Sequence, residues 1–385
     1  MLIPKGTNYM SIIKRLLTLM LAAVMALTLA GCADTAWVMK ANDTVIDAGI
    51  YIYYQTQGYV DAVYQLAEQD ENYYYYYLYG YSLLEDKLND KPVSEHVNDF
   101  AMDMCRQYVV VDTLYNQLGL TLTEDDLAVI DNEVRQAWEK SHEYLETIGV
   151  SKSSLEKVIA SKYKEERVFD AYYEIGGIKG TTEEMINSYV EDEYARVKFI
   201  KFDFADSPDD AIDAARKDEM LALANSYMER ADNGEDFDTL IDEYEATLPE
   251  DEENVEVEEE EPEYEDEETA ALAEKYRNEY ILGLDSTVPS PKFVKYVFSN
   301  CKVGEISVIQ DDISFFVVQR LNVLEREDIM EASRDFIIKE IYDSDYTALI
   351  NTTLSGYTIT VNDKAIKRYT AKNAIFGPND EGKKA

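Results

Sequence analysis

The chain holds few side chains of the kinds that most often carry chemistry. Its 385 residues include two histidines and three cysteines. His96 and His142 each stand beside an acidic residue in a polar stretch, so we expect both on the surface rather than among metal ligands. These numbers exclude a histidine-rich metal enzyme, a zinc ribbon and a fold built on a disulfide framework. The sequence therefore predicts no metal and no other cofactor.

Motifs of the common enzyme classes are missing as well. The sequence contains no phosphate-binding loop, dinucleotide fingerprint, nucleophile elbow or zinc-protease helix, so it gives no support to a hydrolase or a kinase. It has 36 basic and 78 acidic residues, a net charge of -42, and such a surface repels a phosphate backbone. Nucleic acid is thereby excluded as a partner. Hydrophobic residues make up 46% of the chain, enough for the cores of about two or three domains.

One cysteine stands where a chemical modification is expected. Residues 1–31 carry three basic residues and no acid, with the apolar run Leu16–Leu29 near the end, which is the order of a secretory signal. Leu29–Cys32 resembles the lipobox of bacterial lipoproteins, which implies that Cys32 is lipidated and the signal removed. A transmembrane helix is the alternative, but it needs about 20 apolar residues. Met10 is an alternative start.

Removal of the signal leaves a strongly anionic mature protein. Its three basic residues are lost, so the net charge becomes -45. We expect a lipid-anchored protein on the extracytoplasmic face of a bacterial cell membrane. The remaining cysteines, Cys105 and Cys301, are far apart in sequence, and two buried thiols are preferred over one disulfide.

Tyrosine is concentrated near the start of the mature chain. Twelve of the 31 tyrosines lie between Tyr51 and Tyr81. Tyrosine offers broad contact area with little rotamer freedom to lose, which suits a surface that binds varied chains. The alternative is that these rings pack on neighbouring helices or simply face water. The candidate client-binding residues are the consecutive tyrosines Tyr73, Tyr74, Tyr75, Tyr76 and Tyr77.

The periodicity of apolar residues predicts helices first and a mixed segment later. Residues 94–190 read as four short helices, with a strand or helix start before them at Thr44–Tyr54. Three capping pairs are predicted for these helices: Thr123 with Asp126, Ser153 with Glu156, and Thr181 with Glu184. Beyond Tyr194 the pattern first predicts a strand around Ile200–Phe204, a helix opened by Ser207–Asp210, and a helix burying Phe237, Leu240, Ile241 and Tyr244. An apolar-rich segment, Phe293–Phe298, and a buried strand, Ser314–Leu321, follow. The last predicted elements are a helix Glu325–Leu349, a strand Tyr357–Val361 and a loose tail from Lys364; the inward residues of the helix are Ile329, Ala332, Phe336, Ile337 and Ile341.

An acidic block interrupts the mixed segment. Residues 250–268 contain 14 acids in 19 positions. Such a block repels itself and buries too little apolar surface to fold, so we expect a solvated insert, taken as 249–268. The glycine and spaced acids of an EF-hand loop are absent, which disfavours calcium capture.

Four segments, in this order, resemble parts of a known family. They are Ala195–Ile200 for a first strand of the "ARHIL" type, Gly234–Leu240 for a "G-x-D-F-x-x-L" turn and helix, Val303–Ser307 for a "GEIS" turn, and Ser314–Val318 for a last strand of the "GYHII" type. The family is that of the extracytoplasmic foldases of the PrsA and SurA type. The resemblance implies an α+β fold. A helical chaperone domain, 32–190 with the returning segment 325–385, would flank an inserted parvulin-like prolyl isomerase domain, 191–324.

The departures from the family concern its active site. Parvulin sites resemble a hydrogen-bonded histidine pair beneath an apolar proline pocket. Here Lys198 and Phe316 stand at the histidine positions, and the "GGDLG" stretch is missing. Phe293 and Phe316 could line a proline pocket or fill a core. Prolyl isomerisation crosses a barrier of about 20 kcal/mol, so acceleration needs groups that favour the twisted amide. We therefore assign no catalytic residue and expect weak or absent isomerase activity.

The resemblance implies a membrane-anchored chaperone that binds unfolded or nascent secreted proteins. The lipid on Cys32 would hold it at the membrane. A homodimer with a second copy of the chain is a further possibility. An active prolyl isomerase is the first alternative. A solute-binding lipoprotein ranks lowest, because it needs two α/β lobes and the sequence predicts only one α/β segment.

Overall fold

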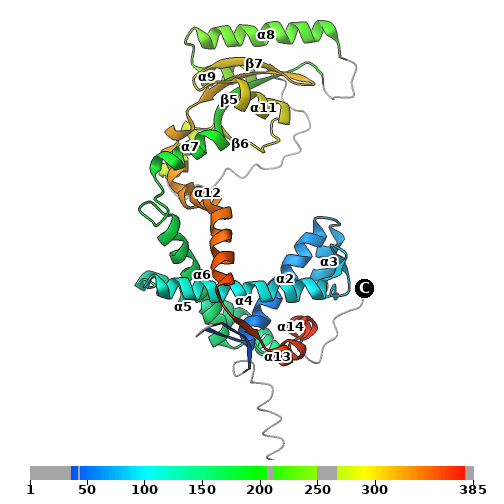
Figure 1. Ribbon diagram of the computed structural model, residues 1–385. Helices are drawn as coiled ribbons and strands as arrows, with labels where there is room; N and C mark the ends of the chain where they lie inside the picture. Colours follow the sequence, from blue (N-terminus) through cyan, green and yellow to red (C-terminus); the bar gives the residue numbers. More distant parts are fainter. Residues whose placement is uncertain (1–35, 42–43, 206–211, 249–266, 378–385) are drawn as a thin grey trace, which may run out of the picture. The chain divides into compact units, whose positions relative to one another are not determined.

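The structure is a computed structural model, and its described residues form two compact units (Figure 1). Unit 1 comprises the chain up to Gly180 together with Tyr342 onward, and unit 2 comprises Thr181–Ile341. The described ranges are 36–41, 44–205, 212–248 and 267–377. Cys32, the signal segment and Ser207–Asp210 lie outside them, as does nearly all of the acidic insert. Among the helices in these ranges, none has the length and apolarity needed to cross a bilayer.

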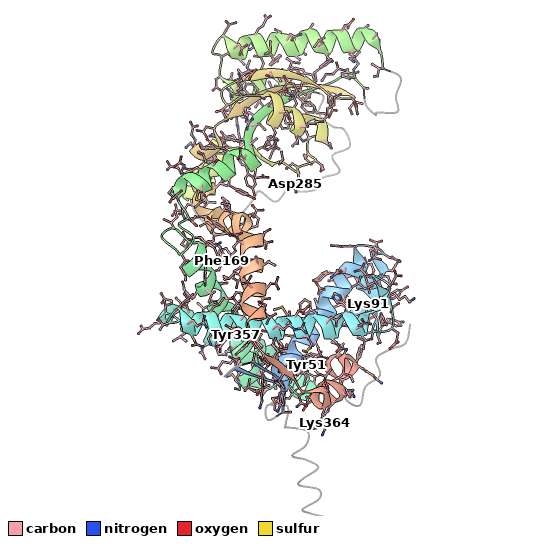
Figure 2. The ribbon with its side chains drawn as sticks, viewed as in Figure 1. Tyr51, Lys91, Phe169, Asp285, Tyr357 and Lys364 are labelled. Carbon is pink, nitrogen blue, oxygen red and sulfur yellow. The ribbon has the colours of Figure 1, made fainter. Side chains whose placement is uncertain are left out.

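Unit 1 is mainly helical and is built around helix α2. Its elements are β1 (Trp37–Ala41), β2 (Thr44–Asp47), α2 (Ala48–Ala67), α3 (Asn72–Leu78), β3 (Lys87–Leu88), β4 (Lys91–Pro92), α4 (Val93–Gln117), α5 (Glu124–Ile148), α6 (Lys152–Tyr173), the end of α12 (Glu327–Ser355), β9 (Ile359–Val361), α13 (Asp363–Arg368) and α14 (Ala371–Phe376). Helices α4, α6 and α14 pack around α2, which is buried along most of its length. Tyr51 of α2, labelled in Figure 2, is fully buried in this core.

A three-stranded sheet joins the two ends of the chain within unit 1. The strand order is β2-β1-β9, and Met39 pairs with Val361. The side chain of Asn362 donates to the carbonyl of Trp37 at 2.9 Å. This pairing corrects the prediction of a loose tail from Lys364. That segment forms α13 and α14 because its small apolar side chains are buried against the unit: Ala365, Ala371, Ala374 and Ile375.

The helices of unit 1 are longer than predicted, and one of the three predicted caps is right. Thr123 and Asp126 form the predicted capping box of α5. Helix α6 is capped by Ser151 rather than Ser153, and α7 (Glu183–Glu193) by Thr182 rather than Thr181. In both corrected cases the hydroxyl that directly precedes the helix accepts a free amide of its first turn: Ser151 from the Ser154 amide, and Thr182 from the Met185 amide. Helices α4 and α5 each run for 25 residues, because their buried side chains recur to the end of each helix.

Unit 2 is a four-stranded antiparallel sheet with helices on both faces (Figure 1). Its elements are α7, β5 (Tyr194–Asp203), α8 (Ala214–Asp232), α9 (Phe237–Glu245), α10 (Glu267–Lys275), β6 (Tyr280–Gly283), α11 (Pro291–Asn300), β7 (Ile306–Gln310), β8 (Ser314–Leu321), the 3₁₀ turn η1 (Val323–Glu325) and the start of α12. The strand order is β6-β5-β8-β7. Side chains alternate along a strand, so Ile200 and Phe202 of β5 face α8 and α9, whereas Val197 and Phe199 face α11.

The mixed helices and sheets confirm an α+β fold, and several details differ from prediction. Helix α7 belongs to unit 2, where Glu183 pairs with Arg334 at 2.9 Å, so the division falls after Gly180 rather than after residue 190. On α12, Ile337 is buried as predicted, together with Ile338, whereas Phe336 and Ala332, which were predicted to face inward, are exposed. Both described cysteines are free and buried, as predicted.

Candidate functional site

Lys198 and Phe316 lie on neighbouring strands but do not share a site. The ammonium of Lys198 lies 2.6 Å from the Asp238 carboxylate on α9, on one face of the sheet. Phe316 points to the opposite face, where it packs against Phe293 of α11. Phe316 is paired across the strands with Lys201, three residues from Lys198. The two predicted positions therefore cannot form one polar pair.

The candidate proline pocket is filled by its own side chains. Phe293 and Phe316 are 0% and 1% exposed, and their ring centroids lie 4.9 Å apart. Phe199 packs edge-on against both rings. These rings belong to a core cluster that is apolar throughout, and the β5 residues facing Phe316 there are Val197 and Phe199. Of the two roles predicted for these phenylalanines, the structure shows the core role.

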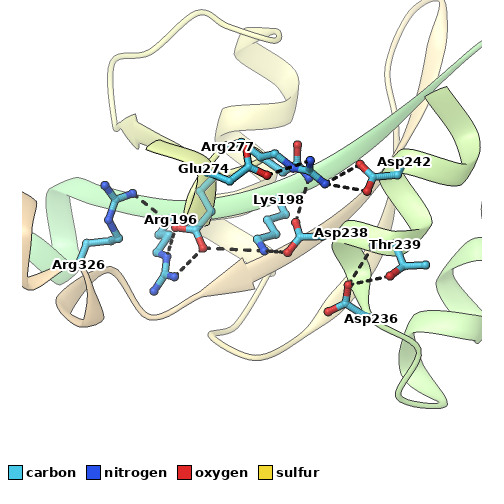
Figure 3. Close-up of polar contacts among 11 residues, drawn as sticks. Arg196, Lys198, Asp236, Asp238, Thr239, Asp242, Glu274, Arg277 and Arg326 are labelled. Atoms are coloured by element: carbon cyan, nitrogen blue, oxygen red, sulfur yellow. Dashed lines mark hydrogen bonds and ion pairs between the residues drawn. The ribbon is translucent and has the colours of Figure 1, made fainter. Parts of the chain in front are cut away.

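Lys198 belongs instead to a network of charges that ties unit 2 together (Figure 3). Glu279, 3% exposed, pairs with Arg196 at 2.6 Å and with Arg326 at 3.4 Å. Arg326 also lies 3.8 Å from the centre of the Tyr276 ring. The network joins β5 to α9, to the segment before β6, and to the start of α12. Every charge in it has a partner, so its role is to hold these elements together.

The predicted tyrosine run forms a short helix with one packed side and one open side. All five tyrosines lie on α3, none of whose residues is fully buried. Tyr73 and Tyr77 pack on the core cluster of α2 and α4. Tyr74, Tyr75 and Tyr76 are 42%, 52% and 41% exposed. The run therefore matches the interpretation in which some rings pack on neighbouring helices and others face water, and client binding stays a prediction.

An open pocket of about 640 Å³ lies among four helices of unit 1. Pockets of about 300–1,000 Å³ are typical of ligand sites. Its lining has an apolar and aromatic part, here called the floor, and a part made of amide and charged groups, here called the rim. The floor is lined by Tyr53 and Tyr54 of α2, Phe100, Met104, Tyr108 and Val111 of α4, Ala137 of α5, and Val158 and Ile159 of α6. The rim includes Gln57, Gln107, Gln136, Glu133, Glu165, Lys140 and Lys162.

The tyrosines of the pocket are neutral hydroxyl groups at physiological pH. Burial raises the pKa of Tyr108 to about 12, with a further contribution from Asp112. Burial also raises the pKa of Tyr53 and of Tyr54. A neutral phenol presents an apolar ring and a hydrogen-bonding group together. The floor can therefore contact an apolar side chain and a peptide group of the same ligand.

Two half-buried carboxylates, on neighbouring helices, line the pocket. Glu133 of α5 accepts a hydrogen bond from the Tyr163 hydroxyl at 2.5 Å. Glu165 of α6 accepts from the Gln107 amide at 2.5 Å and from the Tyr346 hydroxyl at 3.0 Å. The hydrogen bond to Glu133 raises the pKa of Tyr163 to about 12. Neutral donors thus fix the position of each carboxylate without neutralising its charge.

A second pocket of about 510 Å³ adjoins the first along α2. Gln57 lines both. The second pocket is rich in aromatic side chains from α2, α3 and their surroundings, with Phe376 of α14 closing one wall. Its aromatic members are Tyr59, Tyr77, Tyr81, Tyr144 and Phe376. Of the predicted tyrosine run, Tyr77 is the member that lines this pocket.

The residues of the first pocket are not among the candidate site residues predicted from the sequence. They come from segments more than a hundred residues apart, and each residue type is ordinary for an amphipathic helix. Only the packing of α2, α4, α5 and α6 brings them together.

Unit 2 has a smaller and more acidic pocket, of about 320 Å³. Its lining includes Glu193, Glu340 and Asp285, which is labelled in Figure 2. The Tyr194 hydroxyl donates to Glu340 at 2.8 Å. In the described part of the chain, no group of histidine, cysteine and acidic residues is arranged to hold a metal ion. His142 is exposed, and His96 lies 2.7 Å from Asp61.

Comparison with known proteins gives matches to solved structures alone. No family model matches the sequence, and no curated protein matches it. PrsA from Bacillus subtilis is similar at 12% identity and a TM-score of 0.23, over 68% of this chain and 84% of that one. The foldase protein PrsA from Streptococcus pneumoniae is similar at 16% identity and 0.26, over 69% and 85%. The foldase protein PrsA from Lactococcus lactis is similar at 12% identity and 0.31, over 87% and 99%. At these TM-scores the likeness assigns no activity, client or partner to this chain.

Proposed function

We propose that this protein is a chaperone that holds segments of unfolded secreted proteins in the first pocket of unit 1. The observation that carries the proposal is the pocket itself, an open site with an apolar, aromatic and methionine floor and a rim of amides. Unfolded chains expose apolar side chains and unpaired peptide groups together. The pocket offers complementary groups for both. Methionine adapts its shape to varied partners, which suits a site that must accept many sequences.

The expected free energy of binding is small enough for a client to bind transiently. Full burial of one large apolar side chain contributes about 1.5–3 kcal/mol. A micromolar complex needs about 8 kcal/mol, so one inserted side chain gives weak binding. A segment that continues past Gln57 into the second pocket gains a further aromatic surface. Binding spread over two adjoining pockets holds a chain and still lets it leave to fold.

The mature chain is proposed to work from the membrane surface. Cleavage before Cys32 and lipidation of that cysteine would tether it on the extracytoplasmic side, where secreted proteins emerge unfolded. The net charge of -45 on the mature chain would keep the pockets away from anionic lipid.

Prolyl isomerisation is proposed to be weak or absent in unit 2. Phe293 and Phe316 are buried in the core, so the expected proline pocket is closed. Phe316 packs inside a hydrophobic cluster with Phe293 and Phe199, and apolar rings do not stabilise a twisted amide. The solute-binding alternative also loses support, since unit 1 is a helical assembly rather than a second α/β lobe.

The proposal is tested by the aggregation of a reduced, unfolded secreted protein such as lysozyme, followed by light scattering. The full chain should suppress aggregation. Ala137→Phe fills the pocket from α5, and Ala128→Phe adds the same ring at an exposed position of the same helix. We expect the first variant to lose most of the suppression and the second to keep it, with both melting as the parent does. Equal suppression by the two variants, or none by the full chain, would show the proposal to be wrong.

A further inference from the structure

The first pocket contains a combination of charges and rings that selects among segments of an unfolded chain. Glu133 and Glu165 are both half-buried, and both line the pocket. Among the described residues, no lysine, arginine or histidine pairs with either of them; their hydrogen bonds come from Tyr163, Gln107 and Tyr346. A half-buried carboxylate without a cation gains more from a counter-charge than an exposed one does, because water screens it less.

Aromatic rings line the same pocket as these carboxylates. Tyr53 lies close enough to Glu133, and Tyr54 to Glu165, for each carboxylate to raise the pKa of its tyrosine. A cation over the face of an aromatic ring is stabilised by the ring, more strongly when it is partly desolvated. The long carbon stem of a basic side chain also needs apolar surface, which Met104, Val158 and Ile159 provide.

The rim also carries two lysines, Lys140 and Lys162, which could favour the opposite charge. Both are exposed, so water already solvates them. Lys162 lies 5.4 Å from the centre of the Tyr163 ring. Solvated ammonium groups gain little from a ligand carboxylate. The half-buried carboxylates therefore decide the preference of the pocket.

We infer that the first pocket takes a basic side chain, arginine or lysine, from an extended client segment in which apolar residues flank it. The guanidinium or ammonium group lies between Glu133 and Glu165 and over the tyrosine rings, and the flanking apolar residues cover the rest of the floor. This inference rests on the proposed function, to which it adds the class of sequence that is bound. It gives the protein a preference for the basic, apolar segments of its clients.

The test compares short, extended, fluorescently labelled peptides that differ at one central position. The central residue is arginine, its uncharged isostere citrulline, or glutamate, and binding to the full chain is followed by anisotropy. We expect the arginine peptide to bind about tenfold more tightly than the citrulline peptide, which is the size of a partly desolvated cation–π and charge interaction. Glu133→Gln with Glu165→Gln keeps both hydrogen-bond acceptors and should reduce the difference to about twofold.

A matched control separates the effect of the two pocket carboxylates from the effect of the protein's overall negative charge. Glu139→Gln with Glu156→Gln removes two exposed charges from the same helices outside the pocket and should leave the tenfold difference intact. Equal affinity for arginine and citrulline peptides, both blocked by Ala137→Phe, would overturn the inference and leave the proposed function standing. An arginine preference that falls equally in both double variants, or a preference for glutamate, would also overturn it. If no peptide bound, the proposed function would fail as well.

Discussion

The Arg196 guanidinium donates two short hydrogen bonds, of 2.6 and 2.7 Å, to the Glu279 carboxylate inside unit 2. Glu279 is 3% exposed and Arg196 9%. Arg196 comes from the first strand of the sheet, and Glu279 stands just before the strand that pairs with it. The pair therefore fixes β5 against β6 in the interior, where an unpaired charge is costly.

Replacement of Glu279 by glutamine is predicted to destabilise unit 2. The variant keeps the shape of the side chain but leaves Arg196 and Arg326 without a buried counter-charge, which should cost about 3 kcal/mol of unfolding free energy. Urea unfolding measures the loss. Lys292→Ala breaks an exposed pair with Asp312 and should change the free energy by less than about 0.5 kcal/mol. Similar small losses in both variants would contradict the buried role of Glu279.

The pairing of Asp126 with Arg167 predicts a pH dependence in unit 1. Hydrogen bonds from Arg167, and then from the Thr123 backbone, hold the pKa of Asp126 well below its ordinary 3.8. A lowered folded pKa gives stability that is present above pH 3.8 and is lost as the pH falls towards the folded value. Asp126→Asn should therefore melt at a lower temperature than the parent at neutral pH. The gap should narrow below pH 3.8, and a gap independent of pH would contradict this assignment.

The sequence predicted those elements whose packing is local. Phe237, Leu240, Ile241 and Tyr244 are all buried on one face of α9, because helical spacing fixes which side chains share a face. The α5 capping box is equally local and was also predicted. Phe336 shows the limit of such spacing: Phe336 and Ile337 were both predicted to face inward, but the structure buries Ile337 and leaves Phe336 exposed.

Features that depend on distant segments were not predictable in this way. The tail becomes ordered because β9 pairs with β1, more than three hundred residues earlier. The first pocket exists because four helices converge, and no single helix carries its signature. The resemblance placed Lys198 and Phe316 at the two histidine positions, but it could not show that their side chains point to opposite faces of the sheet.

The full chain is predicted to show no prolyl isomerase activity above the uncatalysed rate. Phe293 and Phe316 are packed against each other in a closed hydrophobic core, which leaves no open site for a prolyl ring. A prolyl peptide assay, with a known isomerase as positive control, measures this directly. Clear turnover that Phe293→Ala abolishes would contradict the account, because it would place an open site where the structure has a filled core.

The exposed tyrosines of α3 are predicted to extend the surface that holds long clients. Replacing Tyr74, Tyr75 and Tyr76 by serine should change stability by only about 0.5 kcal/mol per site, since all three are exposed. Suppression of aggregation should fall by about half, while short peptides keep their affinity for the first pocket. Leu127→Ser with Val129→Ser removes exposed apolar groups from α5 and serves as the control. Unchanged suppression in the tyrosine variant would restrict binding to the pockets.

The most direct test of the central claim is an NMR titration of the full chain, labelled at its methionine methyl groups, with a client peptide. The signal to follow is the methyl resonance of Met104. Both methionines pack on the core, but Met104 lines the first pocket and Met102, two residues away on the same helix, does not. The account predicts that the Met104 signal moves progressively with peptide concentration while the Met102 signal stays nearly fixed, and that Ala137→Phe abolishes the movement. A Met104 signal unchanged at peptide concentrations that suppress aggregation would contradict the account, because clients would then bind elsewhere.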